Sequence, residues 1–153
     1  AQSVGPFASR ITPFQPTTQT IALALSTNPL AFAAWVLEKF TVWADTGGRI
    51  ESRFTKDQLL ANIMIYLVND AVGSAIWLYY GATKEEPTRG YITVPTGFAA
   101  YPVEIVPPPP REAAELEFNI TRWTKMPAGG HFAAWEEPAA FAAEVADFFN
   151  GYR

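Results

Sequence analysis

Hydrophobic residues recur at helical spacing through the first half of the chain. Asn28 and Pro29 suit the start of a helix, because an asparagine side chain can accept a hydrogen bond from the first turn and proline needs no donor there. Apolar positions then recur every third or fourth residue, at Leu30, Ala33, Ala34, Leu37 and Phe40. The pattern predicts a helix that begins at Pro29 and ends near residues 45–48, where two glycines stand side by side.

A second helical stretch begins at a capping box and is apolar nearly all round. Thr55 is followed three residues later by Gln58, a pairing in which each side chain satisfies the other residue's backbone N–H. From there to about Tyr80 we expect one helix, or two broken near 69–74, packed on several sides. The longest apolar run, 59–68, is shorter than the roughly 20 residues that cross a bilayer. It therefore predicts a buried helix and no membrane span.

The periodicity changes after the polar segment 83–89. Residues 91–98 are rich in β-branched and aromatic side chains and predict a strand. We expect it to stop at Pro95, because proline donates no hydrogen bond to a neighbouring strand. Four prolines at 107–110 favour a stiff, extended spacer, and residues 116–124 predict a second strand.

A final helix is predicted over residues 138–149. It starts at a proline, carries Phe141, Val145 and Phe148 on one face, and precedes Gly151, the expected C-terminal cap. Helices followed by two strands and a further helix predict an α/β fold.

Composition narrows the chemistry. A chain of 153 residues with 49% hydrophobic residues can bury one core. The net charge of −4 and the lack of a basic run argue against nucleic acid or an anionic membrane as partner. With no cysteine and one histidine, at most a carboxylate-rich metal site could form. We therefore expect neither metal nor cofactor.

The single histidine, His131, is the first candidate for catalysis. Gly129 and Gly130 precede it and allow a sharp turn after the second strand, and the final helix begins soon afterwards. A lone histidine is more often structural, but a loop between packed elements is where functional residues concentrate. Because imidazole exchanges protons near neutral pH, we predict that His131 acts as a general base.

Glu104 is the predicted partner of His131. It follows the first strand and stands between Val103 and Ile105 in an apolar segment, where a carboxylate is rarely buried without a partner. Two groups of acids compete with it. A charged, solvated stretch holds Glu112, Glu115 and Glu117, and a helix start, where the helix dipole favours negative charge, holds Glu136 and Glu137. An acid followed by a histidine after successive strands is the order found in α/β-hydrolases.

The segments 28–40, 54–66, 94–104 and 129–138 resemble the microsomal and juvenile-hormone branch of the epoxide hydrolases. The similarity runs from about Thr20 to the end of the chain. It implies the C-terminal half of an α/β-hydrolase fold, with a helical lid over residues 1–88 followed by the last two core strands and the final helix over residues 89–153.

The resemblance also implies roles for three residues. His131 becomes the base that activates water, and Glu104 becomes its charge-relay acid in a catalytic triad. Tyr79, with Tyr80 as the fallback, becomes the lid tyrosine that protonates the oxygen of a small hydrophobic epoxide during its conversion to a vicinal diol. Judged without the family, both tyrosines would more often be packing residues.

The chain departs from the family in several places. Tyr101 replaces the phenylalanine of the family's motif before Glu104, Trp77 or Leu78 replaces an arginine near Tyr79, and residues 7–15 lack the second lid tyrosine. The aspartate nucleophile has no counterpart. The candidate aspartates are expected at helix ends and on helical surfaces; they are Asp45, Asp57 and Asp70.

We therefore expect a companion polypeptide that carries the N-terminal half and the nucleophile. It would be either the other product of a processed precursor or a separately encoded chain, giving a hetero-oligomer. Two alternatives stay open. A related hydrolase of esters or halides would use Glu104 and His131 without Tyr79, and a noncatalytic structural or binding subunit would retain the motifs as packing.

Overall fold

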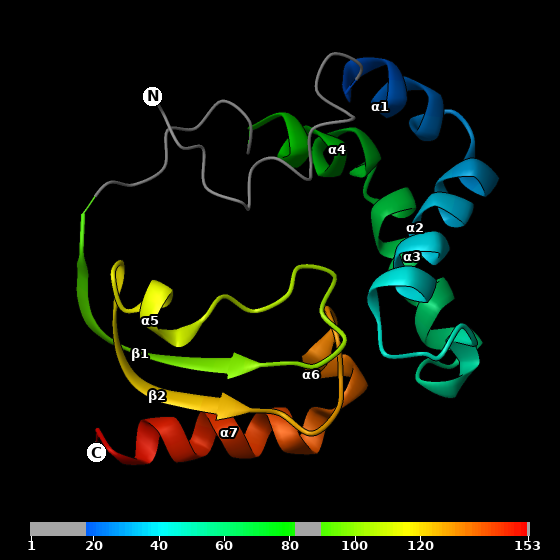
Figure 1. Ribbon diagram of the computed structural model, residues 1–153. Coiled ribbons are helices and arrows are strands. Elements are labelled where there is room, and N and C mark those ends of the chain that lie inside the picture. The colour runs from blue at the N-terminus through cyan, green and yellow to red at the C-terminus, as the bar shows by residue number, and fades with distance from the viewer. Residues whose placement is uncertain (1–17, 82–89, 153) are drawn as a thin grey trace. The chain divides into compact units, whose positions relative to one another are not determined.

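The computed structural model describes residues 18–81 and 90–152 (Figure 1). Its residues cluster into two compact units. Unit 1 comprises the described residues of 1–38 and 55–87, and unit 2 comprises those of 39–54 and 88–153. The predicted domain boundary at residue 88 lies outside the described residues and stays a prediction.

Unit 1 is helical. Its elements are α1 (Thr18–Ser26), most of α2 (Pro29–Trp43), α3 (Lys56–Val68) and α4 (Val72–Gly81). Asn28 caps α2 as predicted, since its side-chain oxygen accepts a hydrogen bond of 3.0 Å from the backbone of Ala31. The capping box of Thr55 and Gln58 is also confirmed at the start of α3. The expected break between helices falls between α3 and α4, where Asp70 has a φ of 50°.

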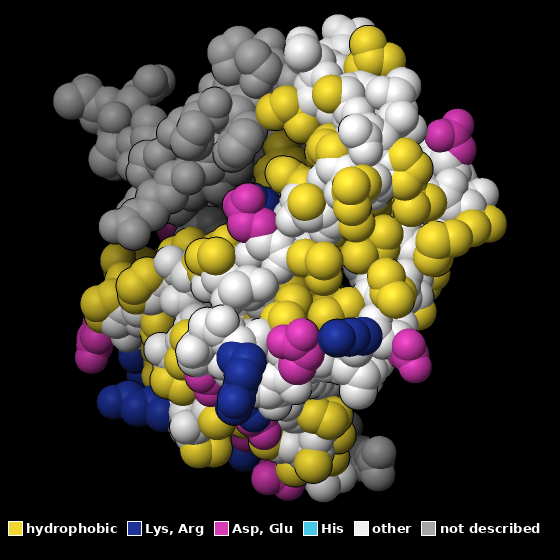
Figure 2. Space-filling view, turned by 90° about the vertical axis from the view of Figure 1, so that its right-hand side faces the viewer, with side chains coloured by type: hydrophobic (Ala, Val, Ile, Leu, Met, Phe, Trp, Pro, Cys, Tyr) yellow, Lys and Arg dark blue, Asp and Glu magenta, His cyan; other side chains and the backbone are white. Residues whose placement is uncertain are grey.

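Aromatic and aliphatic side chains form the core of unit 1. Phe32 is almost completely buried and meets Tyr66 edge to face, with ring centroids 5.7 Å apart. Apolar side chains also reach the surface, and Figure 2 shows many hydrophobic side chains over these helices. On α3 alone, Leu60, Met64 and Val68 are exposed at successive turns. The prediction of a helix apolar nearly all round thus holds, but part of that apolar surface faces solvent.

No single helix within 18–81 or 90–152 is long and apolar enough to cross a membrane. Two sharply bent pairs, α1 with α2 and α3 with α4, meet the length and composition test only when each pair is taken together.

Unit 2 is built on two parallel strands, β1 (Ile92–Ala100) and β2 (Phe118–Lys125), with α7 (Pro138–Asn150) running beside them (Figure 1). Shorter helical elements are η3 (Ile50–Ser52), α5 (Arg111–Ala114) and α6 (Ala133–Glu136). The parallel sheet among helices confirms the predicted α/β class.

One local prediction in unit 2 was wrong and another was confirmed. β1 does not stop at Pro95 but continues to Ala100, because shifts of register on both sides of Pro95 accommodate a residue that has no N–H to donate. Gly151 occupies the C-terminal cap of α7 as predicted, with a φ of −71°. That value lies in the right-handed region, so the cap does not use the left-handed freedom expected of glycine.

Polar contacts join α7 to β2, and an aromatic contact joins β1 to β2. Arg122 on β2 makes hydrogen bonds of 2.6 and 2.7 Å to the carboxylate of Glu144 on α7, which also accepts one of 2.8 Å from Thr124. Within the sheet, the rings of Phe98 and Trp123 stack with centroids 4.3 Å apart. These contacts fix the strands whose carboxyl ends lead to Glu104 and His131.

Candidate active site

His131 and Glu104 meet beyond the carboxyl ends of the two strands. Glu104 lies in the loop after β1, and His131 lies in the loop after β2. Nδ1 of His131 is 3.0 Å from Oε1 of Glu104 and 3.3 Å from Oε2. Because parallel strands end at the same edge of a sheet, the two loops can bring these side chains together. The predicted acid and base are therefore in direct contact.

The surroundings of the pair leave the imidazole accessible. The side chain of His131 is 41% exposed and that of Glu104 is 29% exposed. Glu104 also accepts a hydrogen bond of 2.8 Å from the backbone N–H of Ile105, which helps to orient it. With Nδ1 held by the carboxylate, Nε2 is the ring nitrogen left to face a reactant, and no hydrogen bond joins it to a described residue.

Trp43, at the end of α2, supports the histidine from one side. Its backbone oxygen accepts a hydrogen bond of 3.0 Å from the backbone N–H of His131. Its ring meets the imidazole edge to face, with centroids 5.0 Å apart. The two glycines before the histidine are needed for this approach: Gly129 has a φ of 102°, and a Cβ on Gly130 would lie 2.7 Å from the Trp43 oxygen.

The acid that sequence reasoning missed at this site is Glu136. We expected it at a helix start, but it ends α6, is only 6% exposed, and turns its carboxylate back towards the histidine loop. There it accepts hydrogen bonds from the backbone N–H groups of Asp45, Gly130 and Phe132, at 2.6, 3.0 and 2.8 Å. The sequence feature that could have indicated this contact is the spacing of four residues between Phe132 and Glu136. A carboxylate at that spacing can reach back to the first N–H groups of a short helix.

Asp45 belongs to a second polar network beside the loop. Its carboxylate is 3.0 Å from the guanidinium of Arg53 and accepts a hydrogen bond of 3.1 Å from the backbone of Gly129. Arg53 also pairs with Glu137, which occupies the N-cap position of α7 without a side-chain capping hydrogen bond. Asp45 is thus engaged in structural contacts, in keeping with its rejection as the nucleophile.

The remaining competing acids have surface roles. The stretch that holds them is exposed, as predicted, and contains Glu112, Glu115 and Glu117. Glu115 forms an ion pair with Arg111 one helical turn earlier, at 2.7 Å. Of the acids weighed as partners for the base, Glu104 is the one bonded to the imidazole.

Tyr79 belongs to unit 1, where it has its own surroundings on α4. It is half-buried, and its ring meets that of Trp35 edge to face with centroids 5.8 Å apart. Burial, and to a smaller extent the neighbouring Tyr66, raises the pKa of Tyr79 above its ordinary value of 10.0. The phenol therefore remains a proton donor through neutral and mildly alkaline pH. Tyr80, the fallback, is more exposed and packs on Trp77.

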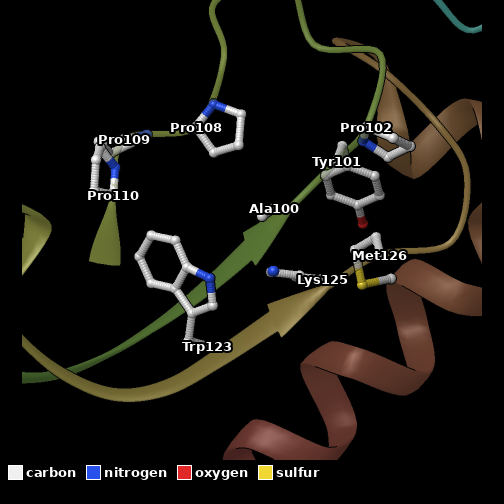
Figure 3. Close-up of a pocket in the computed structure, with 9 residues that line it drawn as sticks. All are labelled: Ala100, Tyr101, Pro102, Pro108, Pro109, Pro110, Trp123, Lys125 and Met126. Atoms are coloured by element: carbon white, nitrogen blue, oxygen red, sulfur yellow. The ribbon is translucent and has the colours of Figure 1, made fainter. Parts of the chain in front are cut away.

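Tyr101, which replaces the family's phenylalanine, lines a pocket of about 520 Å³ in unit 2 (Figure 3). Its hydroxyl is buried without a hydrogen-bond partner among the described residues, and burial raises its pKa. Figure 3 shows Lys125 between Trp123 and Tyr101. The consecutive prolines 108–110 line another part of the same pocket. Neither His131 nor Glu104 lines this pocket.

Within the described residues, no group of three or more acidic, histidine or cysteine side chains is arranged to hold a metal ion. The arrangement around His131 is instead that of an acid and base pair, which can take a proton from water or from another nucleophile.

Comparison with known proteins shows that the chain belongs to the epoxide hydrolases. No family model matches the chain. The chain is 35% identical over 135 to 140 residues to relatives that include epoxide hydrolase 1 of Oryctolagus cuniculus, where the match covers 84% of this chain and 31% of the relative. Juvenile hormone epoxide hydrolase 2 of Ctenocephalides felis is 33% identical, with 82% of this chain and 30% of the relative covered.

A solved structure agrees. The crystal structure of juvenile hormone epoxide hydrolase from the silkworm Bombyx mori superposes with a TM-score of 0.81 and 26% identity, covering 90% of this chain and 38% of the silkworm protein. The match falls on the C-terminal portion of the α/β-hydrolase fold. The chain spans about a third of the length of the curated relatives it matches, less than the half expected from sequence.

Proposed function

Because the chain is related to the C-terminal portion of the epoxide hydrolases, we propose that it is the part of such an enzyme that supplies the base, its relay acid and the lid tyrosine. The completed enzyme converts a small hydrophobic epoxide to a vicinal diol. The observation that carries the proposal is the contact between His131 and Glu104 beyond the ends of adjacent parallel strands. Similarity to epoxide hydrolases alone would not say whether this chain retains the residues that hydrolyse the ester.

In the first step, an aspartate carboxylate attacks one carbon of the epoxide. A C–O bond forms to the aspartate while the ring C–O bond breaks, and its electron pair goes to the ring oxygen. Tyr79 donates its proton to that oxygen as negative charge develops there. The products are a hydroxyalkyl ester of the aspartate and a phenolate. The raised pKa of Tyr79 supports this role because it keeps the phenol protonated before the reaction.

In the second step, Nε2 of His131 takes a proton from water, and the resulting hydroxide attacks the ester carbonyl. Glu104 holds Nδ1 and stabilises the imidazolium that forms. Collapse of the tetrahedral intermediate breaks the ester bond, and the imidazolium returns the proton to the departing alkoxide. The diol leaves, and the aspartate is left as a carboxylic acid that carries the second proton of the water. That proton passes through water to the Tyr79 phenolate, which restores both the aspartate carboxylate and the tyrosine phenol.

The nucleophile comes from the N-terminal portion of the fold, which we propose a companion polypeptide supplies. Among the described residues β1 pairs with β2 alone, so its other edge offers a row of unpaired backbone groups. Ile92 and Val94 are exposed on the same strand, and Tyr91 is exposed just before it. Parallel sheets in α/β proteins are normally buried on both faces and flanked by further strands. The free edge and the exposed side chains therefore support the docking of a complementary sheet.

The experiment is to co-express this chain with the N-terminal portion of one of the relatives above and purify the pair. We expect the wild-type pair to convert styrene oxide to its diol. With His131→Gln, the ester should form but persist, adding the mass of one epoxide to the nucleophile peptide of the companion. Glu104→Gln should slow release of the ester without preventing its formation.

Two outcomes would contradict the proposal. Continued diol formation by the His131→Gln pair would show that another group is the base. A wild-type pair that assembles but neither binds nor turns over epoxides would exclude the activity. If Tyr79→Phe left epoxide turnover unchanged, the pair would have to act without this tyrosine, as a hydrolase of esters or halides could.

A further inference from the structure

Glu136 makes unusual contacts for a buried carboxylate. Oε2 accepts hydrogen bonds from the backbone N–H groups of Asp45, at 2.6 Å, and Gly130, at 3.0 Å. Oε1 accepts one from Phe132, at 2.8 Å. Two of the three donors are the residues immediately before and after His131. The third lies in the turn that follows α2, eighty-five positions before Gly130 in the chain.

The energetics of burial explain what this arrangement requires. A carboxylate removed from water is tolerated only when donors satisfy it, and hydrogen bonds to an ionised acceptor are shorter and stronger than neutral ones. Here the donors given by the structure are all backbone groups. The charge of Glu136 is therefore satisfied only while the loop keeps the N–H groups of Gly130 and Phe132 pointing inward, which fixes the backbone on both sides of His131.

We propose that Glu136 is a positioning residue that holds His131 in register with Glu104 and with the water it activates. This role rests on the proposed function for its catalytic consequence, but the geometry concerns the loop alone. Backbone hydrogen bonds from His131 to Trp43 and from Val103 to Gly129, at 3.0 and 3.2 Å, tie the loop at two further points. Among residues 18–81 and 90–152, Glu136 is the one side chain that accepts hydrogen bonds from the backbone of both neighbours of the histidine.

Glu136→Gln is the sharpest perturbation. The amide keeps the size of the carboxylate but replaces one acceptor oxygen with an NH2 group. In one orientation of the amide its NH2 group faces the backbone N–H of Phe132. In the other orientation it faces the backbone N–H groups of Asp45 and Gly130. In both cases two hydrogen-bond donors face each other. The loop must then move or admit water. Displacement of a reacting group by about 1 Å costs about 100-fold in rate.

The proposed mechanism predicts which step suffers. His131 acts only when the ester is hydrolysed, so Glu136→Gln should slow that step by about 10- to 100-fold and leave ester formation unchanged. The co-expressed pair is mixed with epoxide, quenched at successive times and analysed by mass spectrometry of the nucleophile peptide. A general loss of structure would depress both steps together, so the ratio of the two rates separates positioning from simple destabilisation.

A second measurement is independent of activity. His131 is the only histidine in the sequence, so ¹⁵N-histidine labelling of the full chain gives the imidazole signals of this residue alone. In the wild type we expect the tautomer protonated at Nδ1 and slow hydrogen exchange at the amides of Gly130 and Phe132. In Glu136→Gln both amides should exchange faster, and the tautomer preference should weaken.

Glu144→Gln is the matched control. Its side chain is 13% exposed and bonded to Arg122 and Thr124, away from the histidine loop. It undergoes the same chemical change, and it should alter stability without altering the imidazole signals. If Glu136→Gln does not fold, Glu136→Asp keeps the charge but shortens the reach, and it should give a smaller change in the same direction.

Unchanged imidazole signals and amide exchange in Glu136→Gln, or an equal effect in Glu144→Gln, would overturn the positioning role. Equal slowing of both catalytic steps would do the same. If the wild-type pair forms no ester from any epoxide, the proposed function fails, but the spectra of the full chain still decide whether Glu136 orders the loop.

Discussion

Replacing Gly130 with alanine tests how closely the histidine loop packs against its support. An added Cβ would lie 2.7 Å from the backbone oxygen of Trp43, and 3.1 Å both from the nitrogen of Asp45 and from the oxygen of Val103. All three are backbone atoms, so no flexible side chain can swing aside. Gly130 is not among the glycines with positive φ. Alanine can therefore adopt its conformation, and the substitution tests space alone.

The magnitude follows from these distances. The tightest contact must widen by about 0.7 Å, from 2.7 Å to the 3.4 Å at which ordinary contact begins. Such a shift stretches the hydrogen bonds from His131 to Trp43 and from Gly130 to Glu136, both 3.0 Å long, beyond useful range. Overpacking and the loss of these bonds should together lower the free energy of unfolding by about 2–4 kcal/mol.

Urea denaturation followed by circular dichroism measures this loss. A change of that size moves the midpoint down by on the order of 1–2 M. Gly151→Ala is the matched control, because its Cβ would lie at an ordinary contact distance of 3.6 Å from the oxygen of Phe148, and its φ of −71° suits alanine. That variant should be neutral or more stable by about 0.4–1 kcal/mol. A midpoint for Gly130→Ala equal to that of Gly151→Ala would refute the reasoning.

Two further predictions concern titrating groups. Tyr79→Phe in the co-expressed pair should slow ester formation by about 10²- to 10⁴-fold and leave ester hydrolysis unchanged, whereas Tyr152→Phe, at an exposed position, should change neither. In the wild type, the rate of ester formation should hold into alkaline pH and fall only as pH rises through the raised pKa of Tyr79. A rate that already declines with a midpoint at or below pH 10, as expected for an ordinary phenol, would contradict this. Hydrogen bonding to Arg122 lowers the pKa of Glu144 below 4.5, so the pair's contribution to stability is present above pH 4.5 and is lost as pH falls through the lowered pKa. Urea midpoints of wild type and Arg122→Met should therefore differ at pH 7 and converge in acid, and a difference independent of pH would show that the ion pair is not its cause.

Local patterns in the sequence determined much of the helical structure. The start of α2 at Pro29, the capping box of Thr55 and the start of α7 at Pro138 all appear where sequence predicted them. Caps and apolar spacing act over three or four residues, so a single segment carries the whole signal. The pairing of His131 with Glu104 was also predictable, because parallel strands bring the loops after them to one edge of a sheet.

Tertiary structure decided the features that depend on distant segments. β1 passes through Pro95 because its pairing with β2 shifts register there, which no pattern within the strand reveals. From sequence we expected Glu136 to be an acid at a helix start. In the structure its carboxylate is 2.6 Å from the backbone nitrogen of Asp45, a residue 91 positions away in sequence. Burial turns such a charge from a solvated group into one that must be satisfied by whatever donors the fold supplies. Sequence thus determined the candidate acid and base and that their loops follow adjacent strands, and the meeting of remote backbone segments determined how the histidine is held.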